Sequence, residues 1–224
     1  MGSVIGEILP QAIGVAISPV PIIAVILMLF SKRAKSNGVA FMIGWIMTLA
    51  IVGGLVIVLA NAGKVSAGGT PGMIAYLLKL LLGFIFLFLA RRQWQSRPNE
   101  GEQPQMPKWM ETIDAFSAGR ALGLAALLAG VNPKNLALSL AAAVTIAQAG
   151  LSGAAPWVAL SIFVILGSIT VAAPVIYFLM AGETAEKTLN GWKTWLLANN
   201  ATVMFVLFIV LGVKLIGDGL AGLI

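Results

Sequence analysis

The sequence predicts an all-α integral membrane protein of six transmembrane helices, arranged as two inverted three-helix repeats with broken first and fourth helices. Three observations predict this: composition, six long apolar segments and two matching proline motifs. Of the 224 residues 59% are apolar and 10% charged, and the mean hydropathy is +0.99, outside the range of soluble domains. Only helices and closed barrels satisfy the backbone in hydrocarbon, and long unbroken apolar runs favour helices.

The six apolar segments are each close to or above the ~20 residues that a helix needs to cross a bilayer. An even number of spans places both termini on one side of the membrane. The first segment is too long for a signal-peptide core and has no basic residue before it, so we expect it to be retained. The segments are 4–30, 38–62, 72–90, 119–149, 154–181 and 199–224.

Basic residues are concentrated in the connections on one side of these spans, whereas the other side has only Lys64. The positive-inside rule makes the basic side cytoplasmic and places both termini outside the plasma membrane. The net charge of +6 is therefore a topology signal, and no nucleic-acid partner is predicted. The cytoplasmic set is Lys32, Arg33, Lys35, Arg91, Arg92, Arg97, Lys108, Arg120, Lys187 and Lys193.

The longest polar stretch, 91–112, predicts a cytoplasmic linker between the halves. The predicted division is a first repeat over 1–92, a linker with an interfacial helix over 93–118, and a second repeat over 119–224. The interfacial helix is predicted from Trp109, Ile113 and Phe116, at i, i+4 and i+7. The segment 189–195, with Leu189, Trp192 and Trp195, has a similar pattern. Aromatic anchoring of helices at the inner interface is enough to explain both patterns.

Prolines interrupt the first and fourth spans near mid-membrane. The first span contains Ile-Ser-Pro-Val-Pro over 17–21, and the fourth contains Val-Asn-Pro-Lys-Asn over 131–135. Proline removes a donor and clashes with the preceding turn, so each helix should kink or unwind there. The offset 133 − 19 = 114 also maps Gly53-Gly54 onto Gly167-Ser168. One offset therefore aligns two separate features.

Three spans in each half make the second half enter the membrane from the opposite face. Inverted repeats with interrupted helices predict a transporter site at the midplane. Ser18, Asn132 and Asn135 supply hydrogen-bonding side chains there, and Lys134 supplies a cation for an anionic group. The alternative is that these side chains only satisfy backbone groups freed by the prolines, with Lys134 reaching a water-filled cavity.

Four further charges fall inside the spans: Glu7, Lys79, Lys214 and Asp218. Pairing or snorkelling explains them, since Lys214 and Asp218 are four residues apart on one helix. The alternative is an outer gate or a proton-coupled carboxylate, with Glu7 the better candidate. Small residues such as Gly44, Gly53, Gly54, Gly123 and Gly167 predict close helix packing.

The composition also excludes several kinds of chemistry. The chain has no cysteine and no histidine, which removes thiol chemistry, imidazole catalysis and the commonest transition-metal ligands. Only eight residues are acidic, and no Gly-rich phosphate loop occurs. We therefore predict no enzyme, no cofactor and no metal site.

The Pro-x-Pro break, the Asn-Pro-Lys-Asn motif and the two triplets resemble the LysE superfamily of small exporters. Within it the chain is most similar to the Sap, or GAP, family of sulfolipid- and peptidoglycolipid-addressing proteins of cell envelopes. The resemblance covers essentially the whole chain, but its motifs are short. It implies export, or help in export, of an envelope glycolipid or another small amphiphile by alternating access. The implied substrate-binding residues are Ser18, Pro19, Pro21, Asn132, Pro133, Lys134 and Asn135.

Two other functions remain open. One is a LysE-like amino-acid or ion exporter, and the other is a membrane scaffold for envelope lipid machinery that transports nothing itself. The partners considered are membrane lipids, a small-molecule or lipid substrate, and a homodimer or an envelope-biosynthesis complex.

Overall fold

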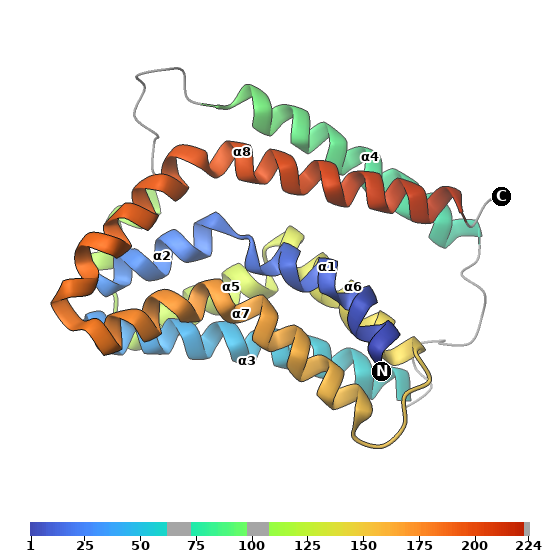
Figure 1. Cartoon of the computed structure of the whole chain (residues 1–224), viewed down its shortest axis with the longest axis horizontal. Coiled ribbons are helices and arrows are strands. Elements are labelled where there is room, and N and C mark those ends of the chain that lie inside the picture. The colour runs from blue at the N-terminus through green and yellow to red at the C-terminus, as the bar shows by residue number, and fades with distance from the viewer. Residues whose placement is uncertain (62–72, 98–107, 222–224) are drawn as a thin grey trace. The chain divides into compact units, whose positions relative to one another are not determined.

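The computed structural model describes residues 1–61, 73–97 and 108–221, and every regular element in these ranges is a helix (Figure 1). Proline and glycine set several of the boundaries: α2 and α6 begin at prolines, and α7 is followed by Gly182, which has a positive φ of 56°. The elements are α1 (Gly2–Ala16), α2 (Pro19–Leu29), α3 (Ala34–Asn61), α4 (Met73–Gln95), η1 (Lys108–Ala115), α5 (Ala118–Gly130), α6 (Pro133–Gln148), α7 (Ala155–Ala181), η2 (Gly182–Thr184) and α8 (Ala185–Leu220).

Three of these helices are long and apolar enough to cross a membrane: α3, α7 and α8. Two bent pairs, α1 with α2 and α5 with α6, raise the number of candidate spans among the described residues to five. The predicted span 72–90 coincides with α4, but residue 72 and several side chains at the start of α4 lie outside the described residues. Six spans therefore stay a prediction.

Both predicted helix breaks are confirmed. The axis turns by 51° between α1 and α2 and by 65° between α5 and α6. The two breaks also match in register, because 130 − 16 and 133 − 19 both equal 114 for the residues that end and restart the helices. The offset found from the prolines thus describes the helix boundaries as well.

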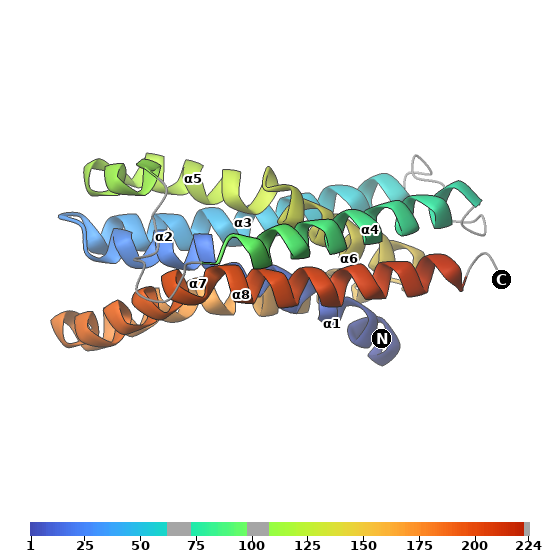
Figure 2. The same ribbon diagram turned by 90° about the horizontal axis from the view of Figure 1, so that it is seen from above.

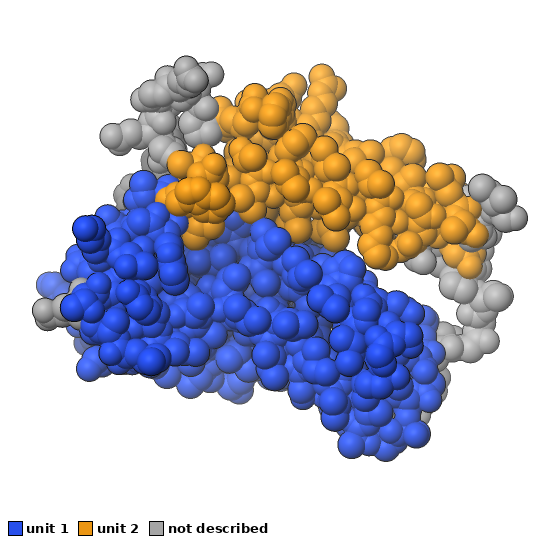
Figure 3. Space-filling model, in the orientation of Figure 1, with its two compact units in different colours: residues 1–67, 106–194 blue, residues 68–105, 195–224 orange. Residues whose placement is uncertain are grey.

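The chain forms two compact units by packing, residues 1–67 with 106–194 and residues 68–105 with 195–224 (Figure 3). Each unit takes residues from both predicted repeats, and α8 contributes to both units. Compact units describe packing and not internal similarity, so the division at 1–92, 93–118 and 119–224 stays a prediction.

The core of the first unit lies where α1, α3, α6 and α7 meet. In it, α1 packs on α6 and α7, and α3 packs on α5, α6 and α7. Trp45 of α3 is fully buried, and its indole Nε1 donates to Gly167 O of α7 at 3.2 Å. A Cβ at Gly167 would lie 3.3 Å from Val15 Cγ1. A small residue is therefore needed where three helices converge.

The two broken helices of this unit run in opposite directions. In Figure 1 and in the turned view of Figure 2, the chain passes from right to left through α1 and α2, and from left to right through α5 and α6. Apolar side chains also point outward from the long helices: Leu55 of α3 is 57% exposed and Ile165 of α7 is 64% exposed. An apolar exterior of this kind suits lipid and not water.

In the second unit, α4 pairs with the C-terminal part of α8. Gly83 and Gly212 face each other, since a Cβ at Gly83 would lie 2.9 Å from Gly212 O. Aromatic rings extend this contact, with the Phe86 and Phe208 centroids 5.6 Å apart. Small residues thus let the two backbones approach closely, as in membrane helix pairs.

The structure corrects three expectations. The segment after the linker is not an α-helix on the membrane surface but the 3₁₀ helix η1, which packs on α2. Because a 3₁₀ helix has three residues per turn, its buried residues are Met110 and Ile113, at i and i+3. The segment 189–195 is no separate interfacial helix, because α8 has no proline and continues through it. Among the described helices Gly123 marks no close approach, because a Cβ there would meet no atom of another helix within 4 Å.

Candidate functional site

The C-terminal end of α1 is the centre of the polar site, because side chains from α6 and α7 bind its last carbonyl groups. A helix leaves its last four carbonyls without partners inside the helix. Here Lys134 Nζ binds Gly14 O at 2.8 Å and Ile17 O at 2.9 Å. Thr170 Oγ1 of α7 donates to Ala16 O at 2.6 Å. Side chains from the second half of the chain therefore bind the carbonyl groups at the break in the first span.

Lys134 lies at the start of α6, yet its ammonium binds at the end of α1. Besides the two carbonyls, Nζ contacts Ser18 Oγ at 2.6 Å, so all three of its protons have acceptors. The side chain is only 8% exposed. A cation is unfavourable at the positive N-terminus of its own helix and favourable at the negative C-terminus of another. This geometry explains how a buried lysine is tolerated within a span.

Ser18 and Asn135 join the two breaks directly. Ser18 Oγ lies 3.0 Å from Asn135 Oδ1 and 2.7 Å from Val15 O, and its single proton serves one of these acceptors at a time. Asn135 Nδ2 donates to Leu128 O of α5 at 2.9 Å. Both side chains are buried. One polar network therefore connects the ends of α1 and α5 with the start of α6.

Asn132 and the prolines shape the beginnings of the second half-helices. Asn132 caps α6, since its Oδ1 accepts from Lys134 N at 3.1 Å. Pro133 begins α6, and Pro19 and Pro21 lie in the first turn of α2. Prolines at these positions remove N–H groups that would otherwise have no partner inside the helix. Each break therefore leaves fewer free donors than an ordinary helix start.

The structure thus brings together Ser18, Lys134 and Asn135, which the sequence proposed as site residues. Their observed partners are all groups of the chain, which agrees with the alternative that they satisfy freed backbone groups. Thr170 was missed by sequence reasoning, because a threonine in an apolar helix more often bonds its own preceding turn. Ser139 and Ser168, also missed, are buried hydroxyls without a partner in the described parts of the chain.

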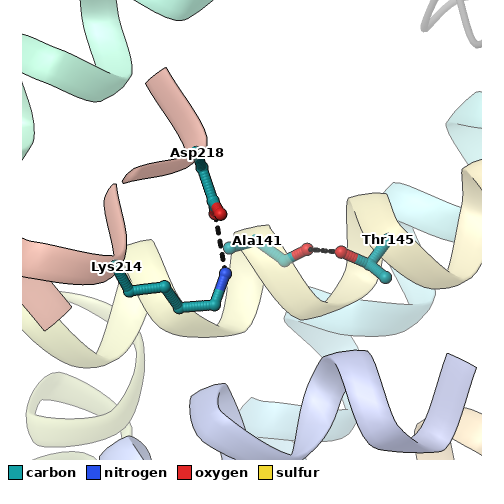
Figure 4. Close-up of polar contacts among 4 residues, drawn as sticks. All are labelled: Ala141, Thr145, Lys214 and Asp218. Atoms are coloured by element: carbon teal, nitrogen blue, oxygen red, sulfur yellow. Dashed lines mark hydrogen bonds and ion pairs between the residues drawn. The ribbon is translucent and has the colours of Figure 1, made fainter. Parts of the chain in front are cut away.

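Of the four other intramembrane charges, the three with described side chains do not join this network. Lys214 Nζ and Asp218 Oδ2 form an i, i+4 ion pair of 2.7 Å on α8, drawn in Figure 4, with side chains 41% and 40% exposed. Pairing therefore explains these two charges. Glu7 is exposed near the start of α1. The side chain of Lys79 lies outside the described residues.

Apolar outward faces and two helices broken at prolines define this chain as a membrane-embedded helical protein with a polar centre. The chain matches the family described as Sap, sulfolipid-1-addressing protein, over residues 8–221. Because this match covers nearly the whole chain, the protein belongs to the Sap family. No curated protein and no solved structure matches it.

Proposed function

We propose that this protein moves, or helps to move, a cell-envelope glycolipid or another small amphiphile across the plasma membrane. Movement takes place by alternating access around the two proline breaks. The name of its family, sulfolipid-1-addressing protein, supports an anionic glycolipid as substrate. The observation that carries the proposal is the Lys134 network, which ties the end of one broken helix to the start of the other.

The packing of the first unit supports an inverted repeat. Exchanging α1 with α5, α2 with α6 and α3 with α7 turns each packed pair between the two triplets into another packed pair. Thus α1–α6 becomes α5–α2, α3–α5 becomes α7–α1, and α3–α6 becomes α7–α2. The opposite directions of the two broken helices agree with such an exchange (Figures 1 and 2). A pseudo-twofold relation of this kind underlies alternating access in many transporters.

Lys134 has the central role in this mechanism. In the observed state the α1 carbonyls and Ser18 hold its ammonium. During transport the ammonium leaves these acceptors and meets the anionic group of the substrate, so that a cation never stays unpaired in the membrane. The substrate's anionic group must replace the α1 carbonyls and Ser18 as the partner of the ammonium, because a charge left unpaired in the interior costs several kcal/mol, of the order of 3–5.

Flux into proteoliposomes tests the proposal. The substrates are a fluorescent sulfated glycolipid, the same lipid without its sulfate, and lysine. We expect wild-type protein to move the sulfated lipid and Lys134→Met to move none. Thr170→Val is the matched control, because it removes a bond to the same end of α1 without removing charge, and it should keep most of the flux.

Other outcomes point elsewhere. Undiminished flux by a normally inserted Lys134→Met protein would remove Lys134 from the site. Flux of lysine alone would favour a LysE-like amino-acid exporter. Absence of flux for every substrate, together with co-purification of envelope lipid enzymes, would favour a scaffold.

A further inference from the structure

A hollow lies on the face where α2 ends and α3 begins, built from residues that the transport proposal does not use. It has a volume of about 440 Å³ and is lined by Lys32 and Arg33 of the α2–α3 turn and by Asp114, Ala115 and Phe116 at the end of η1. All of these residues lie in the first compact unit. The sequence predicts this face to be cytoplasmic.

The hollow carries two cations that no described side chain neutralises. The side chains of Lys32, Arg33 and Asp114 are exposed. In the described ranges the only ion pair within 4 Å is Lys214–Asp218, so Asp114 pairs with neither cation. Lys193 adds a third positive charge near the start of the turn, with Nζ 5.4 Å from the Phe30 ring centroid. The surroundings therefore favour an anion.

Buried hydrogen bonds of Asn37 and Ser31, called the clamp below, connect the α2–α3 turn on one side of the hollow with the end of η1 on the other. Asn37 is fully buried, and its Nδ2 donates to Phe116 O at 3.0 Å and to Ser31 Oγ at 3.4 Å. Ser31 Oγ donates in turn to Met28 O at 2.7 Å. The turn that carries Lys32 and the end of η1 are thus fixed to each other. A site with fixed walls loses little conformational entropy when it binds a ligand.

We propose that this hollow binds the anionic headgroup, a sulfate or phosphate ester, of a lipid in the adjacent leaflet. The arginine fork suits the paired oxygens of such a group, and the lysine adds a point charge. Phe116 offers an apolar surface where the headgroup joins its chains. The positive-inside rule alone explains basic residues on this face, but not a hollow between them or the buried clamp beneath it. Binding here is independent of transport and is measured without flux.

Full-length protein in phosphatidylcholine nanodiscs, analysed by native mass spectrometry, tests the inference. The probes are sulfatide, phosphatidylglycerol, inorganic phosphate, inorganic sulfate and galactosylceramide, which is sulfatide without its sulfate. We expect retention of sulfatide and phosphatidylglycerol but not of galactosylceramide. The double variant Lys32→Gln/Arg33→Gln should weaken retention about tenfold or more, since two charge-assisted contacts are lost.

Two further variants distinguish this site from general surface charge. Arg91→Gln/Arg92→Gln removes the same charge from the same predicted face at two residues that do not line the hollow, and should keep retention within about twofold. Asp114→Asn removes the opposing charge and should strengthen retention about two- to fivefold. Protease accessibility checks that each variant keeps the wild-type topology.

These measurements distinguish a headgroup site in the hollow from binding to general surface charge. Equal losses in the two double variants, or equal retention of sulfatide and galactosylceramide, would overturn the inference. Inorganic phosphate or sulfate binding as tightly as the lipids would keep the anion site but overturn a lipid headgroup as its ligand.

Discussion

Replacing Lys134 with methionine tests whether the polar network holds the two helix breaks together. The substitution keeps the length of the side chain and removes the ammonium. It leaves Gly14 O, Ile17 O and Ser18 Oγ without the donor that each has in the wild-type protein. All three acceptors then need a new partner in the interior.

The expected loss of stability follows from two opposing terms. Three hydrogen bonds from a charged donor contribute about 1.5–3 kcal/mol each. Removing the charge from the membrane recovers about 2.5–3.5 kcal/mol. The difference is a destabilisation of roughly 1–6.5 kcal/mol, centred on about 4 kcal/mol, similar to the cost of breaking a buried charge pair.

Equilibrium unfolding from lipid bicelles measures this difference as a change in the free energy of unfolding. Lys35→Met is the matched control, because Lys35 is exposed, and its effect should stay within about 0.5 kcal/mol. A Lys134→Met protein as stable as the wild type would refute the reasoning, because the three contacts would then contribute no more than the buried charge costs.

Three other predictions concern packing, satisfied hydroxyls and proton coupling. Gly44→Ala should destabilise the fold by about 1–3 kcal/mol, since its Cβ would lie 2.7 Å from a backbone oxygen of α5. Gly123→Ala has open space around the added Cβ among the described helices, so in the same unfolding assay it should be neutral or stabilise the fold by up to about 1 kcal/mol. Thr170→Val should cost about 1–3 kcal/mol through the lost bond to α1, while Ser168→Ala should cost less than about 0.5 kcal/mol because its hydroxyl has no partner in the described chain. Glu7→Gln tests the alternative of a proton-coupled carboxylate, which an unchanged pH profile of transport would exclude.

The helix breaks were predictable because their cause is local. Proline removes its own donor and restricts the residue before it, so Pro19 and Pro133 mark where α2 and α6 begin. The common offset of 114 followed from the same residues. Gly44, Gly53 and Gly167 were also expected at close approaches, and a Cβ at each would lie within 3.4 Å of a neighbouring helix.

The partners of the site residues were not predictable, because they depend on tertiary packing. Lys134 was expected to meet an anionic group, yet it binds carbonyls of a helix 117 and 120 residues away in sequence. Nothing near Thr170 indicates that its hydroxyl reaches α1 instead of its own helix. Likewise, the pattern around Ile113 suggested an α-helical period on the membrane surface, whereas the burial of η1 against α2 selects the 3₁₀ period.

The central claim is that the two broken helices meet, with the end of α1 against the start of α6. The chain has no cysteine, so an introduced pair gives an unambiguous cross-link. A Cβ at Gly14 would lie 3.9 Å from Leu138 Cγ, and Gly14→Cys/Leu138→Cys in native membranes should therefore cross-link readily with a short thiol reagent. Gly123→Cys/Leu138→Cys should not, because no atom of another described helix lies within 4 Å of a Cβ at 123. Equal cross-linking of the two pairs, or none in the first, would contradict the meeting of the two breaks.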